Sequence, residues 1–429
     1  MMTGTVFVAT CDLAAQVRGR AIPAARLERT LATGVGWVPA NLALTGFGHL
    51  AGGSPFGSVG DLRLLPDPAS AIELPADGET PGTRLYLADQ TGLDGAPWPG
   101  CPRTFLAAAL RELRESAGLE VRASFEHEFM LDGPDGEAPF SFQRLRAAEP
   151  FGTDLVALLE HAGLEPECWL PEYGPGQFEI TLRPAPALVA ADRAVLLREL
   201  VRDLARRRGR RATFAPITDP GAVGNGVHVH FSLHAVDGGP VMYDAGAPGR
   251  LSALAARFAA GILRHAAAVV AVTAPNPVSY LRLTPHRWSA GGVFLAERNR
   301  EALLRIAPTV HIGGADPAAQ LHLEYRAADA TANPWLVLGT LVRAGLAGLA
   351  GGERAHVWPE SATEADLAGE PALPDTLETA LAALERDPVA RGWLPPTLLD
   401  AFLAVRRAEL AGTVGLSAAE LCRKVVDVY

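Results

Sequence analysis

Four short segments of the chain carry polar side chains at every second position. Side chains at positions i and i+2 of a β-strand share one face, so the pattern predicts four strands with one polar and one apolar face each. The polar faces carry Glu126 and Glu128 in ASFEHEFML; Gln177, Glu179, Thr181 and Arg183 in GQFEITLR; His228, His230 and Ser232 in GVHVHFSL; and His322, Glu324 and Arg326 in LHLEYR.

The composition of these polar faces indicates a metal site. Taken singly, each strand is also compatible with an ordinary amphipathic strand whose polar side faces water. Solvent faces usually carry Lys, Thr and Ser, whereas these are dominated by Glu, His and Arg. If the four strands share a sheet, their carboxylates converge and raise one another's pKa unless a cation lies between them. Carboxylates with an occasional imidazole favour Mg²⁺ or Mn²⁺.

A cluster of arginines follows in SYLRLTPHRW and AERNREALLRI, and contains Arg282, Arg298, Arg300 and Arg305. On a chain of net charge -10, such a cluster favours phosphate binding over its alternative, a solvated basic patch. Lys424 is the only lysine, which excludes a P-loop lysine or a Schiff-base lysine elsewhere in the chain.

Charge and cysteine usage narrow the class of protein. The net negative charge argues against a nucleic-acid partner. Four widely separated cysteines without a CxxC pair argue against a zinc site or a disulfide framework, and fit a reducing cytoplasm. We recognise no signal peptide at the N-terminus. The most apolar stretches, Leu251–Pro275 and Pro334–Gly351, are interrupted by arginines and predict buried helices rather than membrane spans.

The pattern of elements predicts two domains. Residues 1–100 are rich in Gly and Pro with short apolar runs, which indicates a small β-rich domain. Pro102 suits the first turn of a helix that Gly118 can end, and a second long helix is expected from about Ala187 to Arg208. We therefore expect an α+β chain, divided into residues 1–100 and 101–429.

Five motifs, in order, resemble those of the glutamine synthetase family: FEHEF, PEYGPGQFEI, GNGVHVHFSL, RNREALLR and LEYRAADATANP. The resemblance extends over nearly the whole chain. It implies an N-terminal β-grasp domain, followed by a catalytic domain built on an antiparallel sheet curved into a funnel with helices outside. It also implies an ATP-dependent ligase that phosphorylates the γ-carboxylate of glutamate, or of an analogue, and lets an amine displace the phosphate.

The resemblance implies roles for individual residues. One metal would be held by Glu128, Glu172 and Glu179, and another by Glu126, His228 and Glu324, with two or three Mg²⁺ or Mn²⁺ ions in all. Arg282 and Arg326 match positions that bind the carboxylates of the amino acid, and Gly224 matches a backbone position that lines the pocket of that substrate. Arg300 and Arg305 match positions that contact the transferred phosphate and ATP. His230 and Ser232 match positions on the nucleotide side. Arg282, Arg300 and Arg326 would be catalytic.

The chain departs from the family mainly around the amine. Counting from Arg282, Trp288 stands where glutamine synthetases carry an acid, and Gly34–Gly53 has no acid where they have an Asp-Gly-Ser-Ser-like stretch. Val223 replaces an asparagine, and basic residues expected near Ala319 and His322 are missing.

Loss of two acids disfavours ammonium and favours an organic amine, with Trp288 in its pocket, as in the γ-glutamyl amine ligases of the family. The alternatives are a glutamine synthetase that uses ammonium, a non-catalytic family member and a ligand sensor. The resemblance further implies a ring-shaped homo-oligomer, a dodecamer of two hexameric rings, with small-molecule substrates as its other partners.

Overall fold

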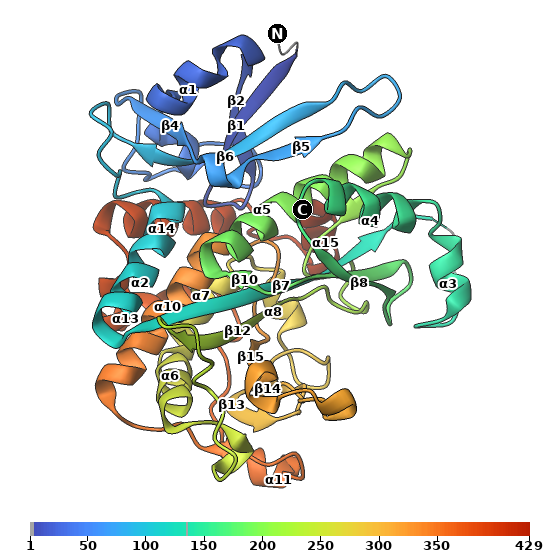
Figure 1. The fold of residues 1–429 in the computed structure, drawn as a ribbon, viewed down its shortest axis with the longest axis vertical. Coiled ribbons are helices and arrows are strands. Elements are labelled where there is room, and N and C mark those ends of the chain that lie inside the picture. The colour runs from blue at the N-terminus through green and yellow to red at the C-terminus, as the bar shows by residue number, and fades with distance from the viewer. Residues whose placement is uncertain (1–3, 134–135) are drawn as a thin grey trace.

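The computed structural model describes residues 4–133 and 136–429, and it contains two sheets surrounded by helices (Figure 1). The first sheet has six strands in the order β2-β1-β6-β4-β3, with β5 also paired to β6. β1 runs antiparallel to β2 and parallel to β6, and α1 packs on β4. This is the β-grasp domain that was expected. Its elements are β1 (Thr5–Cys11), β2 (Val17–Pro23), α1 (Leu27–Thr33), β3 (Val35–Trp37), β4 (Leu62–Pro66), β5 (Ile72–Leu74) and β6 (Thr83–Thr91).

The second sheet has ten strands and contains all four predicted polar faces. Its order is β16-β13-β14-β15-β12-β7-β9-β8, and β10 and β11 also pair with β7. The strands are β7 (Leu119–Leu131), β8 (Pro166–Pro171), β9 (Gln177–Leu182), β10 (Ala185–Pro186), β11 (Ala212–Thr213), β12 (Val227–Ala235), β13 (Gly292–Glu297), β14 (Ala302–Ile306), β15 (Leu323–Tyr325) and β16 (Val357–Trp358).

One edge of this sheet differs from the antiparallel arrangement that was expected. From β14 to β8 neighbouring strands are antiparallel, but β13 runs parallel to both β14 and β16. Residues 298–301 lead the chain from the last residue of β13 back to the level of its first residue. Gly292 therefore pairs with Ala302, and β13 and β14 run in the same direction. The fold class is otherwise confirmed.

Alternation along β7 separates a helix-covered face from the face that forms the site. Phe125 and Phe129 are buried beneath helices that pack on β7, while Glu126 and Glu128 point to the other face. Burying one such aromatic side chain contributes about 1.5–3 kcal/mol. The helices against β7 are α2 (Pro102–Ala117) and α5 (Ala187–Arg207), with α2 ended by Gly118 in the left-handed conformation.

α10 (Pro334–Gly351) is the central helix of the catalytic domain. It packs against α2, α5, α6 (Ala253–Arg264) and α7 (Ala266–Thr273). Among the described helices, α10 alone has the length and apolarity of a membrane span, and α6 with α7 pass the same test only as a bent pair. Two-thirds of α10 is buried inside the protein, as the sequence predicted.

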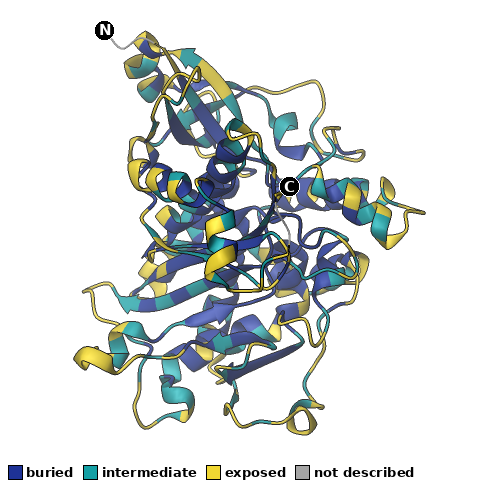
Figure 2. Ribbon diagram, turned by 90° about the vertical axis from the view of Figure 1, so that its right-hand side faces the viewer, coloured by how far each residue is buried: buried dark blue, intermediate teal, exposed yellow. Residues whose placement is uncertain are grey.

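Exposed residues concentrate in the outer loops and helices, and buried ones in the two sheets and the helices between them (Figure 2). Those outer elements include α11, in a polar segment where only a loop was expected. The remaining helices are α3 (Phe142–Ala147), α4 (Phe151–His161), α8 (Ser279–Arg282), α9 (Pro317–Gln320), α11 (Glu364–Leu367), α12 (Leu377–Arg386), α13 (Pro388–Trp393), α14 (Pro396–Ala411) and α15 (Ala418–Val426).

A buried arginine joins the two sheets. Arg103 of α2 donates to Asp67 at 2.6 Å and to Asp89 at 3.0 Å, both in the N-terminal part, and to Asp192 of α5 at 2.8 Å. Removing one partner of such a buried charge network costs about 3–5 kcal/mol, because an uncompensated charge remains. The two sheets are therefore held in one arrangement.

Candidate active site

The strand register brings the predicted polar residues face to face. Glu126 of β7 pairs with His228 of β12, and Glu128 pairs with Glu179 of β9. Glu324 of β15 pairs with His230 on one side and with Arg305 of β14 on the other. The four strands share one sheet, so the convergence predicted on that condition is confirmed, and most of these side chains are buried or half-buried rather than facing water.

A cavity of about 550 Å³ opens over one end of this surface. Four carboxylates, of Glu126, Glu128, Glu172 and Glu179, line it. It is also lined by Gly224, His228, Arg282, Trp288, Arg300 and Arg326. The other predicted site residues, His230, Ser232, Arg305 and Glu324, lie beyond this lining on the same sheet. The predicted set thus divides into a cavity group and a group further along the sheet.

Burial and mutual repulsion raise the pKa of two carboxylates in the cavity. Burial, reinforced by the charges of Glu126 and Glu172, raises the pKa of Glu128 to about 7, although the Gly226 N–H donates to its carboxylate at 2.6 Å. Burial, together with the charges of Glu126, Glu128 and Glu172, raises the pKa of Glu179 to about 11. Crowded carboxylates of this kind need a cation between them, and an all-oxygen donor set suits Mg²⁺ or Mn²⁺.

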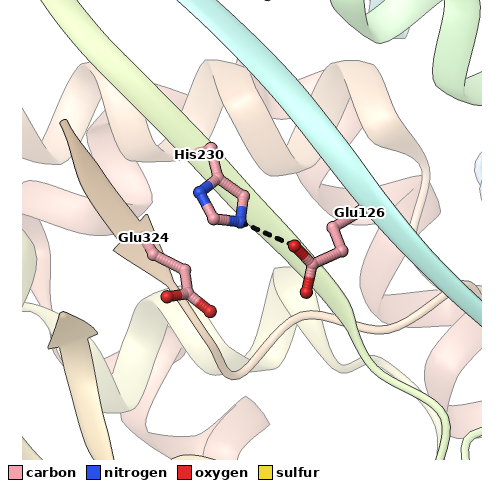
Figure 3. A group of neighbouring side chains, drawn as sticks. All are labelled: Glu126, His230 and Glu324. Carbon is pink, nitrogen blue, oxygen red and sulfur yellow. Dashed lines mark hydrogen bonds and ion pairs between the residues drawn. The ribbon is translucent and has the colours of Figure 1, made fainter. Parts of the chain in front are cut away.

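A second group joins Glu126 to Glu324 through imidazoles. The ligand atoms of Glu126, His230 and Glu324 all lie within 4.8 Å of one another, and their side chains turn toward a common space (Figure 3). His228 also belongs here, because its Nδ1 lies 2.8 Å from Glu126 and 3.6 Å from Glu324. The sequence assigned His228 to the metal and His230 to the nucleotide, whereas both imidazoles contact the carboxylates in the structure.

His322, which alternation placed on the same polar face as Glu324, extends this group through a contact with His230 that the sequence did not predict. Its Nε2 lies 3.0 Å from Nδ1 of His230, and its Nδ1 lies 2.7 Å from the carbonyl of Gln320. If Nδ1 of His322 donates to that carbonyl, Nδ1 of His230 donates to His322, and Nε2 of His230 keeps its lone pair toward Glu126. A lone pair facing a carboxylate at 3.1 Å is stabilised by a proton or a metal ion between them.

Arginines surround the far end of the carboxylate surface. Arg326 and Arg305 both form ion pairs with Glu324, the latter at 2.7 Å. Burial opposes ionisation of Glu324, but Arg326 and the two neighbouring histidines lower its pKa to about 2. Glu324 is therefore a carboxylate at any working pH, consistent with its predicted role.

Gly224 is required by the packing of Arg282. The guanidinium of Arg282 is buried and donates to the carbonyls of Ala327 and Ala328 at 2.7 and 2.9 Å. A Cβ at position 224 would lie 2.4 Å from Cγ of Arg282, so only glycine fits there. The resemblance alone implied Gly224; the close approach supplies its physical reason.

Trp288 lies at the rim of the cavity on residues 284–291, here called the 288 loop. Its side chain is 67% exposed, so the indole is not part of the buried core. Its backbone N–H donates to Glu301 at 3.0 Å, and its carbonyl accepts from Arg326 at 2.9 Å. Arg300 lies over its ring at 5.9 Å. Sequence reasoning missed Glu301, although it stands in the RNREALLR motif.

Comparison with known sequences agrees with this geometry. The sequence model of the glutamine synthetase catalytic domain matches residues 99–421, and that of the glutamine synthetase N-terminal domain matches residues 4–98. The chain belongs to the glutamine synthetase family. It is accordingly a ligase-family chain whose relatives act with ATP and divalent metals.

Relatives within the glutamine synthetase family cover most of the chain. The γ-glutamylpolyamine synthetase GlnA3 of Streptomyces coelicolor is 36% identical over an alignment of 433 positions, which covers 96% of this chain and 90% of that relative. The glutamine synthetase of Methanocaldococcus jannaschii is 31% identical over an alignment of 383 positions, which covers 83% of this chain and 82% of that relative. A crystal structure of a novel glutamine synthase homolog matches with TM-score 0.93 and 46% identity over 100% and 99% of the two chains. GmaS without ligand matches with TM-score 0.83 and 26% identity over 97% and 94%.

Proposed function

We propose that this protein is an ATP-dependent ligase that joins the γ-carboxylate of glutamate, or of a close analogue, to an organic amine. The observation that carries the proposal is Trp288, whose aromatic ring stands at the rim of a carboxylate-lined cavity where the family resemblance expects an acid. The name of one relative, a γ-glutamylpolyamine synthetase, supports a non-ammonium acceptor.

Different residues of the site bind the amino acid and ATP. Arg282 and Arg326 orient the carboxylates of the amino acid in the cavity, with Gly224 giving that substrate room. Arg300 and Arg305 orient the phosphates of ATP, and His230 and Ser232 lie on the nucleotide side. Glu128, Glu172 and Glu179 would hold one cation, and Glu126, His228 and Glu324 another, with His230 close enough to contribute. When bound, these cations neutralise the charge of the phosphates.

The reaction follows in two steps. A γ-carboxylate oxygen takes the terminal phosphoryl group of ATP and ADP leaves. The amine nitrogen then attacks the acyl carbon, the C–N bond forms as the C–O bond to phosphate breaks, and the nitrogen loses a proton. Arginines fixed by backbone carbonyls need no rearrangement during either step, which favours catalysis by preorganisation.

The acceptor side of the cavity favours an amine with a carbon skeleton. Ammonium needs anionic or dipolar partners once it leaves water. An indole offers one N–H donor and a large apolar face, and accepts no proton. Packing of each methylene group against such a face contributes about 0.8 kcal/mol. Loss of acids at Trp288 and in Gly34–Gly53 therefore shifts preference from ammonium to larger amines.

Phosphate release separates the candidate functions. The protein is incubated with glutamate, ATP, Mg²⁺ and either ammonium or one of a panel of organic amines, with the Glu128→Ala variant as the control for contaminating ATPase. We expect kcat/KM for the best organic amine to exceed that for ammonium by roughly tenfold or more. Preference for ammonium would indicate glutamine synthetase itself. ATP binding without phosphate release for any acceptor would indicate a sensor or a non-catalytic member.

We further propose a cytoplasmic homo-oligomer of ring form, a dodecamer of two hexamers, without nucleic-acid or membrane partners. Support comes from membership of the family, from the net charge of -10 and from the buried position of α10.

A further inference from the structure

We propose that the acceptor carries a single positive charge on an apolar or aryl body, and that an aromatic mouth selects it; this rests on the proposed function. The aromatic mouth consists of Phe140, Tyr173 and Trp288, three side chains from three separate loops that all line the carboxylate cavity. They are 55%, 61% and 67% exposed, and it is their grouping around one cavity, rather than the exposure of any one of them, that indicates a binding surface.

Two of the three loops are tied together by one buried guanidinium. Arg144 of α3 donates to the carbonyl of Glu137, on the segment that leads to Phe140. The same side chain donates to the carbonyls of Glu172 and Gly174, which flank Tyr173, the latter at 2.9 Å. Arg144 is only 7% exposed, so this link is part of the folded interior. The positions of Phe140 and Tyr173 are thus set together.

The third loop is held independently. The carboxylate of Glu301 accepts the backbone N–H groups of His286 and Trp288, and Arg326 donates to the Trp288 carbonyl. Hydrogen bonds therefore fix the backbone of the three loops that carry the aromatic mouth before a ligand arrives. Aromatic faces attract organic ammonium groups and pack against hydrocarbon, which suits an alkyl or arylalkyl amine.

Charge at the aromatic mouth argues against a second ammonium group. Among the described residues that line the cavity, the acids are Glu126, Glu128, Glu172 and Glu179, all assigned to cations. The positive charges at the mouth are Arg300, which lies over the Trp288 ring at 5.9 Å, and Arg287, whose guanidinium donates to the carbonyls of Ala222 and Pro220 at 3.0 Å each. A diamine in the cavity would bring its distal charge toward these arginines without a free carboxylate to meet it.

The nearby acids Glu301 and Glu364 do not line the cavity. Glu301 is bound to the 288 loop, and Glu364 of α11 lies 3.6 Å from Nδ1 of His286 and is 86% exposed. Gly34–Gly53, the segment that the resemblance associates with the amine, has no acid. The structure thus assigns this chain a different acceptor class from that in the name of GlnA3, a γ-glutamylpolyamine synthetase.

Matched pairs of amines test the proposal. Phosphate release is measured with butylamine, phenethylamine, putrescine and ammonium on the full-length protein with ATP, glutamate and Mg²⁺. Butylamine and putrescine have the same carbon chain and differ only in the second amino group. We expect kcat/KM for butylamine to exceed that for putrescine by roughly tenfold, because the distal charge loses its hydration without gaining a partner.

Single variants connect this preference to the aromatic mouth. Tyr173→Ala and Phe140→Ala should each lower kcat/KM for butylamine by roughly three- to tenfold, with KM for ATP unchanged and ammonium little affected. Phe142→Ala is the matched control, because Phe142 is 74% exposed, stands two residues from Phe140 and does not line the cavity. Melting temperatures of the variants confirm that they fold.

The possible results separate this inference from the proposed function. Preference for putrescine over butylamine overturns the inference and leaves an organic-amine ligase standing. Preference for ammonium over every organic amine overturns the proposed function. Equal losses for butylamine and ammonium in Tyr173→Ala and Phe140→Ala show that the aromatic side chains only support their loops, which also overturns the inference.

Discussion

Glu301→Ala should release the 288 loop and lower activity toward the amine without touching the nucleotide side. One oxygen of Glu301 accepts the N–H of Trp288 at 3.0 Å, and the other accepts that of His286 at 3.1 Å. His286 and Trp288 both adopt left-handed backbone angles, with φ of 64° and 53°, which non-glycine residues rarely do. Gly291 leaves the space for this carboxylate, since a Cβ there would lie 2.4 Å from its Oε2.

The size of the effect follows from these two hydrogen bonds. Hydrogen bonds to a charged group contribute about 1.5–3 kcal/mol each when buried, but water can replace part of them at the half-exposed 288 loop. We take about 1–2 kcal/mol for the pair; the strain of the two φ angles, about 1 kcal/mol each, is present in the ordered loop with or without Glu301 and adds nothing to this difference. This corresponds to roughly a five- to thirtyfold fall in the ordered loop and in kcat/KM for an organic amine.

The assay combines kinetics with hydrogen exchange. Glu301→Ala should lower kcat/KM for butylamine, leave KM for ATP unchanged and speed amide exchange in residues 284–291. Glu301→Gln keeps one carbonyl oxygen as an acceptor, so it should recover part of the loss. Glu353→Gln, which removes another exposed carboxylate, one paired with Arg264, serves as the control. Unchanged exchange, or parallel losses for amine and ATP, would refute the argument.

Three further predictions concern the proposed reaction and assembly. Glu128→Ala and Glu324→Ala should each abolish turnover while the protein stays folded, and should weaken Mn²⁺ binding measured by electron paramagnetic resonance. Wild-type activity of both variants at limiting Mg²⁺ would contradict the metal site. Trp288→Glu should lower kcat/KM for the best organic amine by roughly 10²-fold more than for ammonium, with ATP affinity little changed; equal losses show that the indole only supports the loop. Light scattering should give the mass of a ring-shaped oligomer, and a stable, fully active monomer excludes that assembly.

Local patterns predicted the parts of the fold that follow from neighbours in sequence. Alternation alone placed Glu126 and Glu128 on one face and Phe125 and Phe129 on the other, and the sheet has this arrangement. α2 begins at Pro102 and is ended by Gly118, because both residues have fixed backbone preferences.

Contacts between segments far apart in the chain could not be predicted from the sequence. Arg103 meets three aspartates, and Arg144 ties two loops, through pairs far apart in the chain. No periodicity signals such contacts, because they depend on the packing of whole elements. The same is true of His230, whose position opposite Glu324 depends on the register between β12 and β15. The parallel pairing of β13 depends on a four-residue return that propensities do not specify.

The layout of the site explains how the acceptor could change while the phosphoryl chemistry is kept. Glu126 lies between the two groups, lining the cavity while contacting His228 and His230 on β12. Most residues proposed for phosphate and metal stand on the sheet, where a changed side chain would disturb paired neighbours; Glu172 and Arg300 lie in loops next to β8 and β14. The departures from the family at Val223 and Trp288 lie on loops at the cavity rim, which tolerate substitution without altering strand register. Selection for a new amine can therefore act on the rim alone, and the six proposed metal ligands remain in place because the reaction's first step still requires them.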